Sequence, residues 1–145
     1  MVETDVKKLR EILLDEEACL FERYRAMFSL RNLGTKEANL ALAEGLLCKN
    51  ALFRHEIAYV LGQIQSEDTK DALFQCLRNT SENDMVRHEC AEALGSIASE
   101  DINQELGKYL GKEEPAVLRE SCVVALDFVD YNKSEEFQYA NSATA

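Results

Sequence analysis

The tripeptide Arg-His-Glu occurs twice in this chain of 145 residues, as Arg54-His55-Glu56 and as Arg87-His88-Glu89. The two copies lie 33 residues apart, and an apolar run follows each of them, over residues 57–64 and 90–97. Imidazole nitrogens and carboxylate oxygens are ligands that transition metals accept in proteins. A repeat that duplicates a His-Glu pair therefore duplicates a set of potential metal ligands.

The repeat that carries these pairs runs the length of the chain. Its arginine recurs at Arg23, Arg54, Arg87 and Arg119, with spacings of 31, 33 and 32 residues. Upstream of each arginine stand two leucines four residues apart: Leu9 and Leu13, Leu42 and Leu46, Leu73 and Leu77, Leu106 and Leu110. Leucines at i and i+4 share one face of a helix, so each pair predicts the first helix of a hairpin whose second helix carries the arginine. Polar segments such as residues 79–84 and 112–115 are predicted to be turns.

Four hairpins of this period predict an all-α fold, a short α-solenoid of four HEAT-type helical hairpins over residues 1–130. Aromatic residues are expected to join the leucine pairs in one continuous core; they are Phe28, Tyr59, Phe74 and Tyr109. No segment has the strict apolar alternation that is typical of a strand. Residues 131–145 are more polar, which predicts a polar tail or the start of a linker.

Composition narrows the choice of partners and of compartment. The net charge of −11, from 16 basic and 27 acidic residues, disfavours nucleic acid and favours a cationic ligand, although acidity also serves solubility alone. No apolar run of membrane-spanning length and no signal-like N-terminus is present, so we expect a cytoplasmic protein without a membrane partner. The five scattered cysteines form no CxxC pair, which indicates reduced core residues.

Helix geometry directs the two histidines away from the core. Successive helical residues are 100° apart, so His55 sits about 200° around the axis from Ile57, where the apolar stripe begins. His88 stands in the same relation to Cys90. A satisfied core histidine is therefore disfavoured, and the remaining structural alternative is two solvated His-Glu pairs inherited by duplication of the repeat.

The distance between stacked helices makes a shared metal site feasible. Axes of packed helices are about 8–10 Å apart, so side chains from equivalent positions need to cover only about 4–5 Å each. Two histidines and one carboxylate with open positions are the ligand set of non-haem Fe(II) oxygenases. Zinc hydrolysis also fits these ligands, although the His-Glu-x-x-His spacing of metalloproteases is absent.

Several strings of the chain resemble the N-terminal half of deoxyhypusine hydroxylase; they cover residues 21–28, 54–63, 85–95, 119–122 and 137–140. The resemblance implies a HEAT-repeat di-iron monooxygenase that hydroxylates the deoxyhypusine side chain of a translation initiation factor to form hypusine. In that family each half donates two His-Glu motifs, and the two irons lie between the halves. By resemblance, His55, His88 and Glu89 are ligands of one iron, and Glu56 is the acidic residue that holds the substrate amine.

This chain has two His-Glu motifs, whereas the full enzyme of that family has four. The resemblance therefore implies one Fe(2+) per chain, and a di-iron site only when a second HEAT half or a second copy of the chain is added. We expect the isolated chain to be inactive unless it is paired. The alternative hypothesis is a non-catalytic HEAT-repeat adaptor that binds another protein along its concave face without a metal.

Overall fold

The structure is a computed structural model that describes residues 2–133, which form eight α-helices and no strand. The helices make four hairpins in chain order: α1 (Val2–Leu14) with α2 (Leu20–Leu33), α3 (Lys36–Glu44) with α4 (Ala51–Ile64), α5 (Lys70–Arg78) with α6 (Asp84–Ile97), and α7 (Glu100–Leu106) with α8 (Ala116–Lys133). Short 3-10 turns, Gly45–Leu47 and Gly107–Tyr109, extend α3 and α7, and a third, Glu67–Thr69, precedes α5. The predicted all-α solenoid of four helical hairpins is confirmed.

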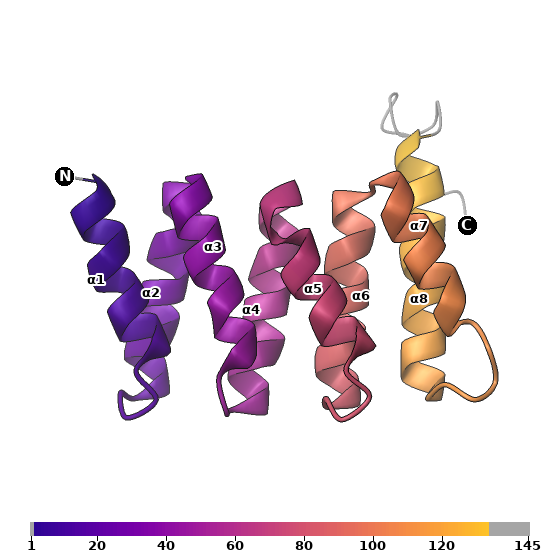
Figure 1. Ribbon diagram of the computed structural model, residues 1–145, viewed down its shortest axis with the longest axis horizontal. Coiled ribbons are helices and arrows are strands. Elements are labelled where there is room, and N and C mark those ends of the chain that lie inside the picture. Colours follow the sequence, from indigo (N-terminus) through magenta and orange to yellow (C-terminus); the bar gives the residue numbers. More distant parts are fainter. Residues whose placement is uncertain (1, 134–145) are drawn as a thin grey trace, which may run out of the picture.

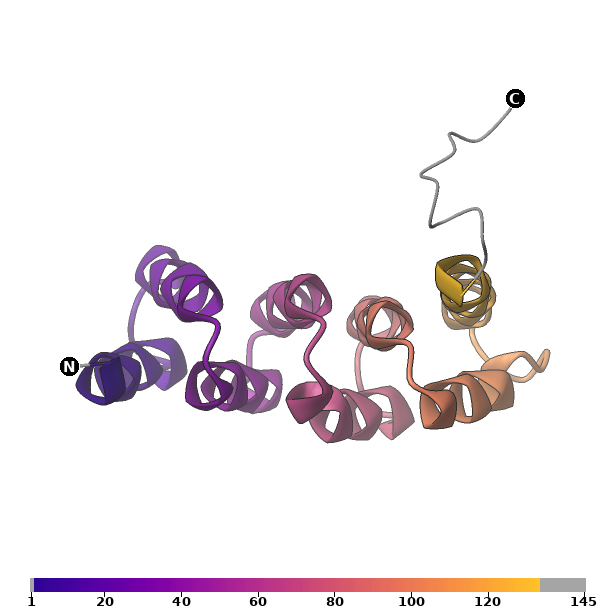
Figure 2. The same ribbon diagram turned by 90° about the horizontal axis from the view of Figure 1, so that it is seen from above.

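The hairpins stack side by side and form two layers (Figure 1). Viewed from above, α1, α3, α5 and α7 form one row, and α2, α4, α6 and α8 form the other (Figure 2). The second row lies on the inner side of the gentle curve of the stack. Equivalent positions of the four second helices therefore face the same side of the molecule.

Leucines of the first helices and apolar residues of the second helices build the core between the two layers. Leu13, Leu42, Leu73, Leu77 and Leu106 have no exposed surface, and burial of one such side chain stabilises the fold by about 1.5–3 kcal/mol. Three expectations about the core are wrong. Leu110 is 41% exposed because α7 ends at Leu106, and Phe28 and Tyr59 lie on the inner row with exposed rings.

Two of the recurring arginines tie the two helices of their hairpins together. Arg23 and Arg87 are buried, and the Nε atom of each donates a hydrogen bond to a carbonyl near the end of the preceding first helix, Leu13 at 3.0 Å and Leu77 at 2.9 Å. Arg54 instead donates through Nη1 to the carbonyl oxygens of Cys48 and Lys49, which follow the 3-10 turn after α3, and Arg119 donates to that of Glu114 in the turn before α8. The last carbonyls of a helix lack partners within it, so Arg23 and Arg87 satisfy buried acceptors.

Two glycines allow the inner helices to approach closely. A Cβ atom at Gly62 of α4 would lie 3.2 Å from the Cα atom of Ala93 on α6. A Cβ atom at Gly95 of α6 would lie 2.9 Å from the Cβ atom of Ala125 on α8. Since both glycines are the twelfth residue of their helix and both alanines are the tenth, successive inner helices pack with the same axial offset.

The other expectations from sequence concern the cysteines, the membrane and the C-terminal segment. Cys48, Cys76, Cys90 and Cys122 are free and buried, whereas Cys19 is free and exposed. None of the helices within residues 2–133 has the length and apolarity that crossing a membrane requires. The segment predicted to be a tail begins inside α8, which continues to Lys133, and its residues 134–145 lie outside the described part of the chain.

Candidate metal centre

The two His-Glu pairs occupy the same helical positions on adjacent inner helices. Both α4 and α6 contain 14 residues, and in each helix the histidine is the fifth residue and the glutamate the sixth. Asn50 and Asn83 cap the N-termini of these helices: their side-chain oxygens accept hydrogen bonds from the backbone N–H groups of Phe53 and Met85. Because α4 and α6 begin at equivalent positions of the repeat, both His-Glu pairs lie on the inner face.

The carboxylate of Glu89 lies between the two imidazoles. Its Oε1 atom is 3.2 Å from Nε2 of His55, across the α4–α6 interface, and 3.6 Å from Nε2 of His88 on its own helix. The Glu89 side chain is only 12% exposed. Burial raises the pKa of this carboxyl, and the neighbouring His55 opposes the rise by favouring the charged form. The three residues predicted as ligands thus come together.

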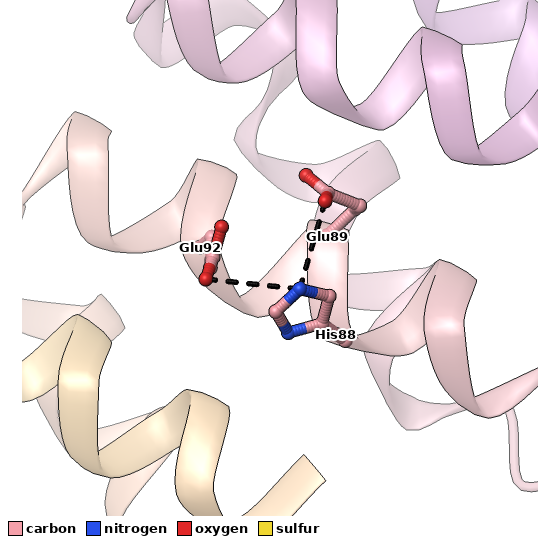
Figure 3. A group of neighbouring side chains, drawn as sticks. All are labelled: His88, Glu89 and Glu92. Atoms are coloured by element: carbon pink, nitrogen blue, oxygen red, sulfur yellow. Dashed lines mark ion pairs between the residues drawn. The ribbon is translucent and has the colours of Figure 1, made fainter. Parts of the chain in front are cut away.

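A further carboxylate, Glu92, joins the cluster. Its Oε1 atom is 3.7 Å from Nε2 of His88, and one ligand atom each of His88, Glu89 and Glu92 lies within 4.8 Å of the other two. Both carboxylates approach the same ring nitrogen of His88 (Figure 3). Glu92 is not among the residues predicted from the sequence, although its position four residues after His88 places it on the same helix face. This compact group does not include His55, which connects to it through Glu89.

Glu56 lies on the other side of His55 from Glu89. Its Oε1 atom is 3.5 Å from Nδ1 of His55, and its side chain is 32% exposed. Beyond it, Tyr24 occupies the fifth position of α2, and its hydroxyl is buried without a hydrogen-bond partner among the described residues. Burial raises the pKa of this tyrosine, and the charge of Glu56 adds to the rise. A partly exposed carboxylate at this edge of the cluster is suited to bind a cation.

The row of inner-face residues continues onto α8 through Ser121. The Oγ atom of Ser121 lies within hydrogen-bond distance of Nδ1 of His88. This contact has the same register as the contact between His55 and Glu89, in which the fifth residue of one helix meets the sixth residue of the next. Ser121 is not among the site residues predicted from the sequence, where residues 119–122 count only as a repeat arginine and as part of the family resemblance.

The distance from Glu89 to each imidazole suits ligation of a transition-metal ion by that pair of residues. Ligands bound at about 2.0–2.2 Å from one ion stand about 3.0–3.6 Å apart in octahedral or tetrahedral arrangements. The separations of 3.2 Å and 3.6 Å from Glu89 to the two imidazoles fall in this range. Two imidazoles and one carboxylate suit Fe(II) and also zinc, so the donor set alone does not choose between these metals.

Fold and site together define the class: an α-solenoid of HEAT-type repeats with a candidate His/Glu metal-binding group on its inner helices. No protein-family model matches the chain. The chain is, however, similar over nearly its whole length to curated proteins named deoxyhypusine hydroxylase. Those from Rattus norvegicus and Homo sapiens are 58% and 56% identical over 139 residues, which are 96% of this chain and 46% of each relative. The one from Danio rerio is 59% identical over 136 residues, which are 94% of this chain and 44% of that relative.

A solved structure of human deoxyhypusine hydroxylase in complex with glycerol resembles this chain as well. The TM-score is 0.83 at 57% sequence identity, and the match covers 87% of this chain and 43% of that one. The resemblance to deoxyhypusine hydroxylase is therefore confirmed in both sequence and fold. The chain spans slightly less than half the length of the relatives it matches.

Proposed function

We propose that this chain is the N-terminal half of a non-haem di-iron monooxygenase of the deoxyhypusine hydroxylase type. The observation that carries the proposal is the placement of Glu89 between the imidazoles of His55 and His88, on a chain 56–59% identical to proteins of that name. The proposed substrate is the deoxyhypusine side chain of a translation initiation factor in the cytoplasm. Its hydroxylation forms hypusine.

In this proposal His55, His88 and Glu89 hold one Fe(2+) per chain. Iron, when bound, supplies the activation of dioxygen. The Oε1 atom of Glu89 already lies 3.2 Å from Nε2 of His55 and 3.6 Å from Nε2 of His88, so this carboxylate needs little rearrangement to share an ion with either imidazole. Burial of Glu89 disfavours its charged form, and a bound cation reverses that preference because metal ligation requires the deprotonated carboxylate.

Glu56 has the proposed role of holding the cationic amine of the substrate. Its carboxylate lies beside the metal ligands but is more exposed than Glu89, which leaves it open to a charge-assisted hydrogen bond from an ammonium group. The cluster as a whole contains three carboxylates beside two imidazoles, and the chain carries a net charge of −11. Both features attract a polyamine-like cation.

The first test is the iron content of the His88→Ala variant after purification and reconstitution with Fe(II) under nitrogen. We expect about one iron per wild-type chain and nearly none in the variant. The matched control is Glu120→Ala, since Glu120 occupies the same position on α8 and is exposed. Stoichiometric iron in His88→Ala contradicts the site, and zinc in place of iron in the wild-type chain favours a hydrolase. Absence of any metal from the wild-type chain favours the adaptor hypothesis.

The second test concerns the ligands of a second iron. One chain supplies one ligand set, and two-metal chemistry needs a second ion about 3.5–4 Å away. We expect the strictly monomeric chain to bind iron but not to hydroxylate a deoxyhypusine-bearing substrate. Activity is expected when a second half with two His-Glu motifs is added, or when two copies pair with facing inner surfaces. Light scattering combined with the hydroxylation assay distinguishes these cases, and turnover by a monomer contradicts the proposal.

A further inference from the structure

Ser121 lies outside the His-Glu motifs, and its hydroxyl contacts a proposed ligand directly. It is the sixth residue of α8, only 4% exposed, and its Oγ atom lies against Nδ1 of His88 on the neighbouring helix. The same Oγ atom donates a hydrogen bond to the carbonyl oxygen of Val117, one turn earlier in α8. The serine hydroxyl therefore lies between a backbone acceptor and the imidazole.

The hydrogen count decides what the imidazole must do. A serine hydroxyl has one hydrogen, and a carbonyl oxygen can only accept, so the hydrogen of Ser121 is directed to Val117. The Oγ atom then offers a lone pair to Nδ1 of His88, and only a ring that carries its proton on Nδ1 completes this contact. In the neutral ring of this tautomer Nε2 carries no proton and is free to bind a metal; it lies 3.6 Å from Glu89 and 3.7 Å from Glu92.

We propose that Ser121 is a positioning residue that holds His88 in the Nδ1–H tautomer, so that Nε2 is the ligand atom directed at the metal. The inference rests on the proposed function, because it gives His88 a role toward a bound ion. Histidines that bind metals usually donate their second ring N–H to a neighbouring acceptor, which sets both the tautomer and the ring orientation. Here the acceptor is supplied by the next repeat, so a complete site requires the fourth hairpin although that hairpin has no His-Glu motif.

The register of the solenoid accounts for this arrangement. The offset that sets His55 against Glu89 also sets His88 against residue 121, because α4, α6 and α8 pack with the same glycine-to-alanine contact. At the His55–Glu89 interface the incoming side chain is a carboxylate, which is a potential ligand. At the next interface it is a hydroxyl, which is short and neutral and serves as a hydrogen-bond partner behind the ring.

The direct test is the imidazole tautomer in the metal-free protein. Long-range ¹H–¹⁵N spectra of the uniformly labelled chain, recorded at about pH 8.5 where an ordinary imidazole is neutral, distinguish a protonated Nδ1 from a protonated Nε2. We expect His88 of the wild-type chain to be in the Nδ1–H form and Ser121→Ala to lose that preference. Ser121→Thr, which keeps the hydroxyl, is expected to retain it. A wild-type His88 with its proton on Nε2 overturns the proposal, whether or not any variant folds.

Metal affinity provides the second measurement, with Fe(II) under nitrogen and Co(II) as an oxygen-stable probe. Loss of such a supporting hydrogen bond weakens binding by about 10- to 100-fold, and we expect this decrease in Ser121→Ala. The matched control is Ser96→Ala, because the Ser96 hydroxyl bonds the carbonyl of Glu92 four residues earlier on α6. Unchanged tautomer and unchanged affinity in a folded Ser121→Ala chain refute the proposal. A wild-type chain with the Nδ1–H tautomer that binds neither metal refutes the proposed function and leaves the orienting role of Ser121 supported.

Discussion

Glu105 joins the third hairpin to the fourth and offers a quantitative test of the packing behind the site. Its carboxylate accepts two hydrogen bonds from Arg78 of α5, at 2.7 Å and 3.2 Å, and one each from Lys108 and Tyr109. The Glu105 side chain is 6% exposed, whereas that of Arg78 is 54% exposed. The Arg78 guanidinium is the main reason why the pKa of Glu105 falls from 4.5 to about 2.

This lowered pKa makes stability depend on pH in a defined window. A carboxyl whose pKa is lower in the folded state contributes its full stabilisation above its unfolded value of 4.5 and loses it as the pH falls through about 2. A shift of this size corresponds to about 3 kcal/mol at neutral pH. Because solvent screens the half-exposed Arg78, we reduce the expected contribution to about 1–2 kcal/mol.

We therefore expect Glu105→Gln to lower the free energy of unfolding by about 1–2 kcal/mol at pH 7 and to flatten its decline between pH 5 and pH 2. Urea denaturation followed by far-UV circular dichroism, repeated across this pH range, measures both effects. Glu100→Gln is the control, because Glu100 lies on the same helix with its side chain 79% exposed. A Glu105→Gln chain whose stability falls with acid in parallel with the wild type refutes the reasoning.

Three further predictions concern the scaffold. Gly95→Ala places a Cβ atom 2.9 Å from that of Ala125 and should destabilise the chain by about 1–3 kcal/mol in thermal denaturation. Gly107→Ala, with no atom within 4 Å of the added Cβ, should not, and equal effects of the two would contradict the packing argument. Arg87→Met leaves the buried Leu77 carbonyl without its side-chain donor and should cost about 1–3 kcal/mol in urea denaturation; a neutral result would exclude that bond as a stabilising contact. Metal removal by chelation should leave the far-UV circular dichroism intact because the core is continuous without a metal, and loss of most of the helical signal would indicate a structural metal instead.

Much of the scaffold follows from the sequence because its determinants are local and repeated. Arg23, Arg54, Arg87 and Arg119 are each the fourth residue of a second helix, so their spacing predicts the four hairpins. The residue pattern does not predict burial where a helix ends early or where a side chain lies on the inner row. Leu110 keeps the leucine spacing but follows the end of α7, and Tyr59 is apolar enough for a core but faces solvent.

Some features of the candidate site also follow from the sequence, whereas others are decided by the tertiary structure. Helix periodicity placed His55 and His88 on one face, away from the core stripe, and the repeat placed a glutamate beside each of them. Periodicity within one helix does not state which residue of the next helix lies opposite. Which residues lie opposite each other depends on the axial offset between neighbouring helices. The close contacts at Gly62 and Gly95 recur with the same offset from one inner helix to the next. Only the tertiary structure shows that His55 meets Glu89 and that His88 meets Ser121, because a fifth position packs against a sixth rather than against its own equivalent.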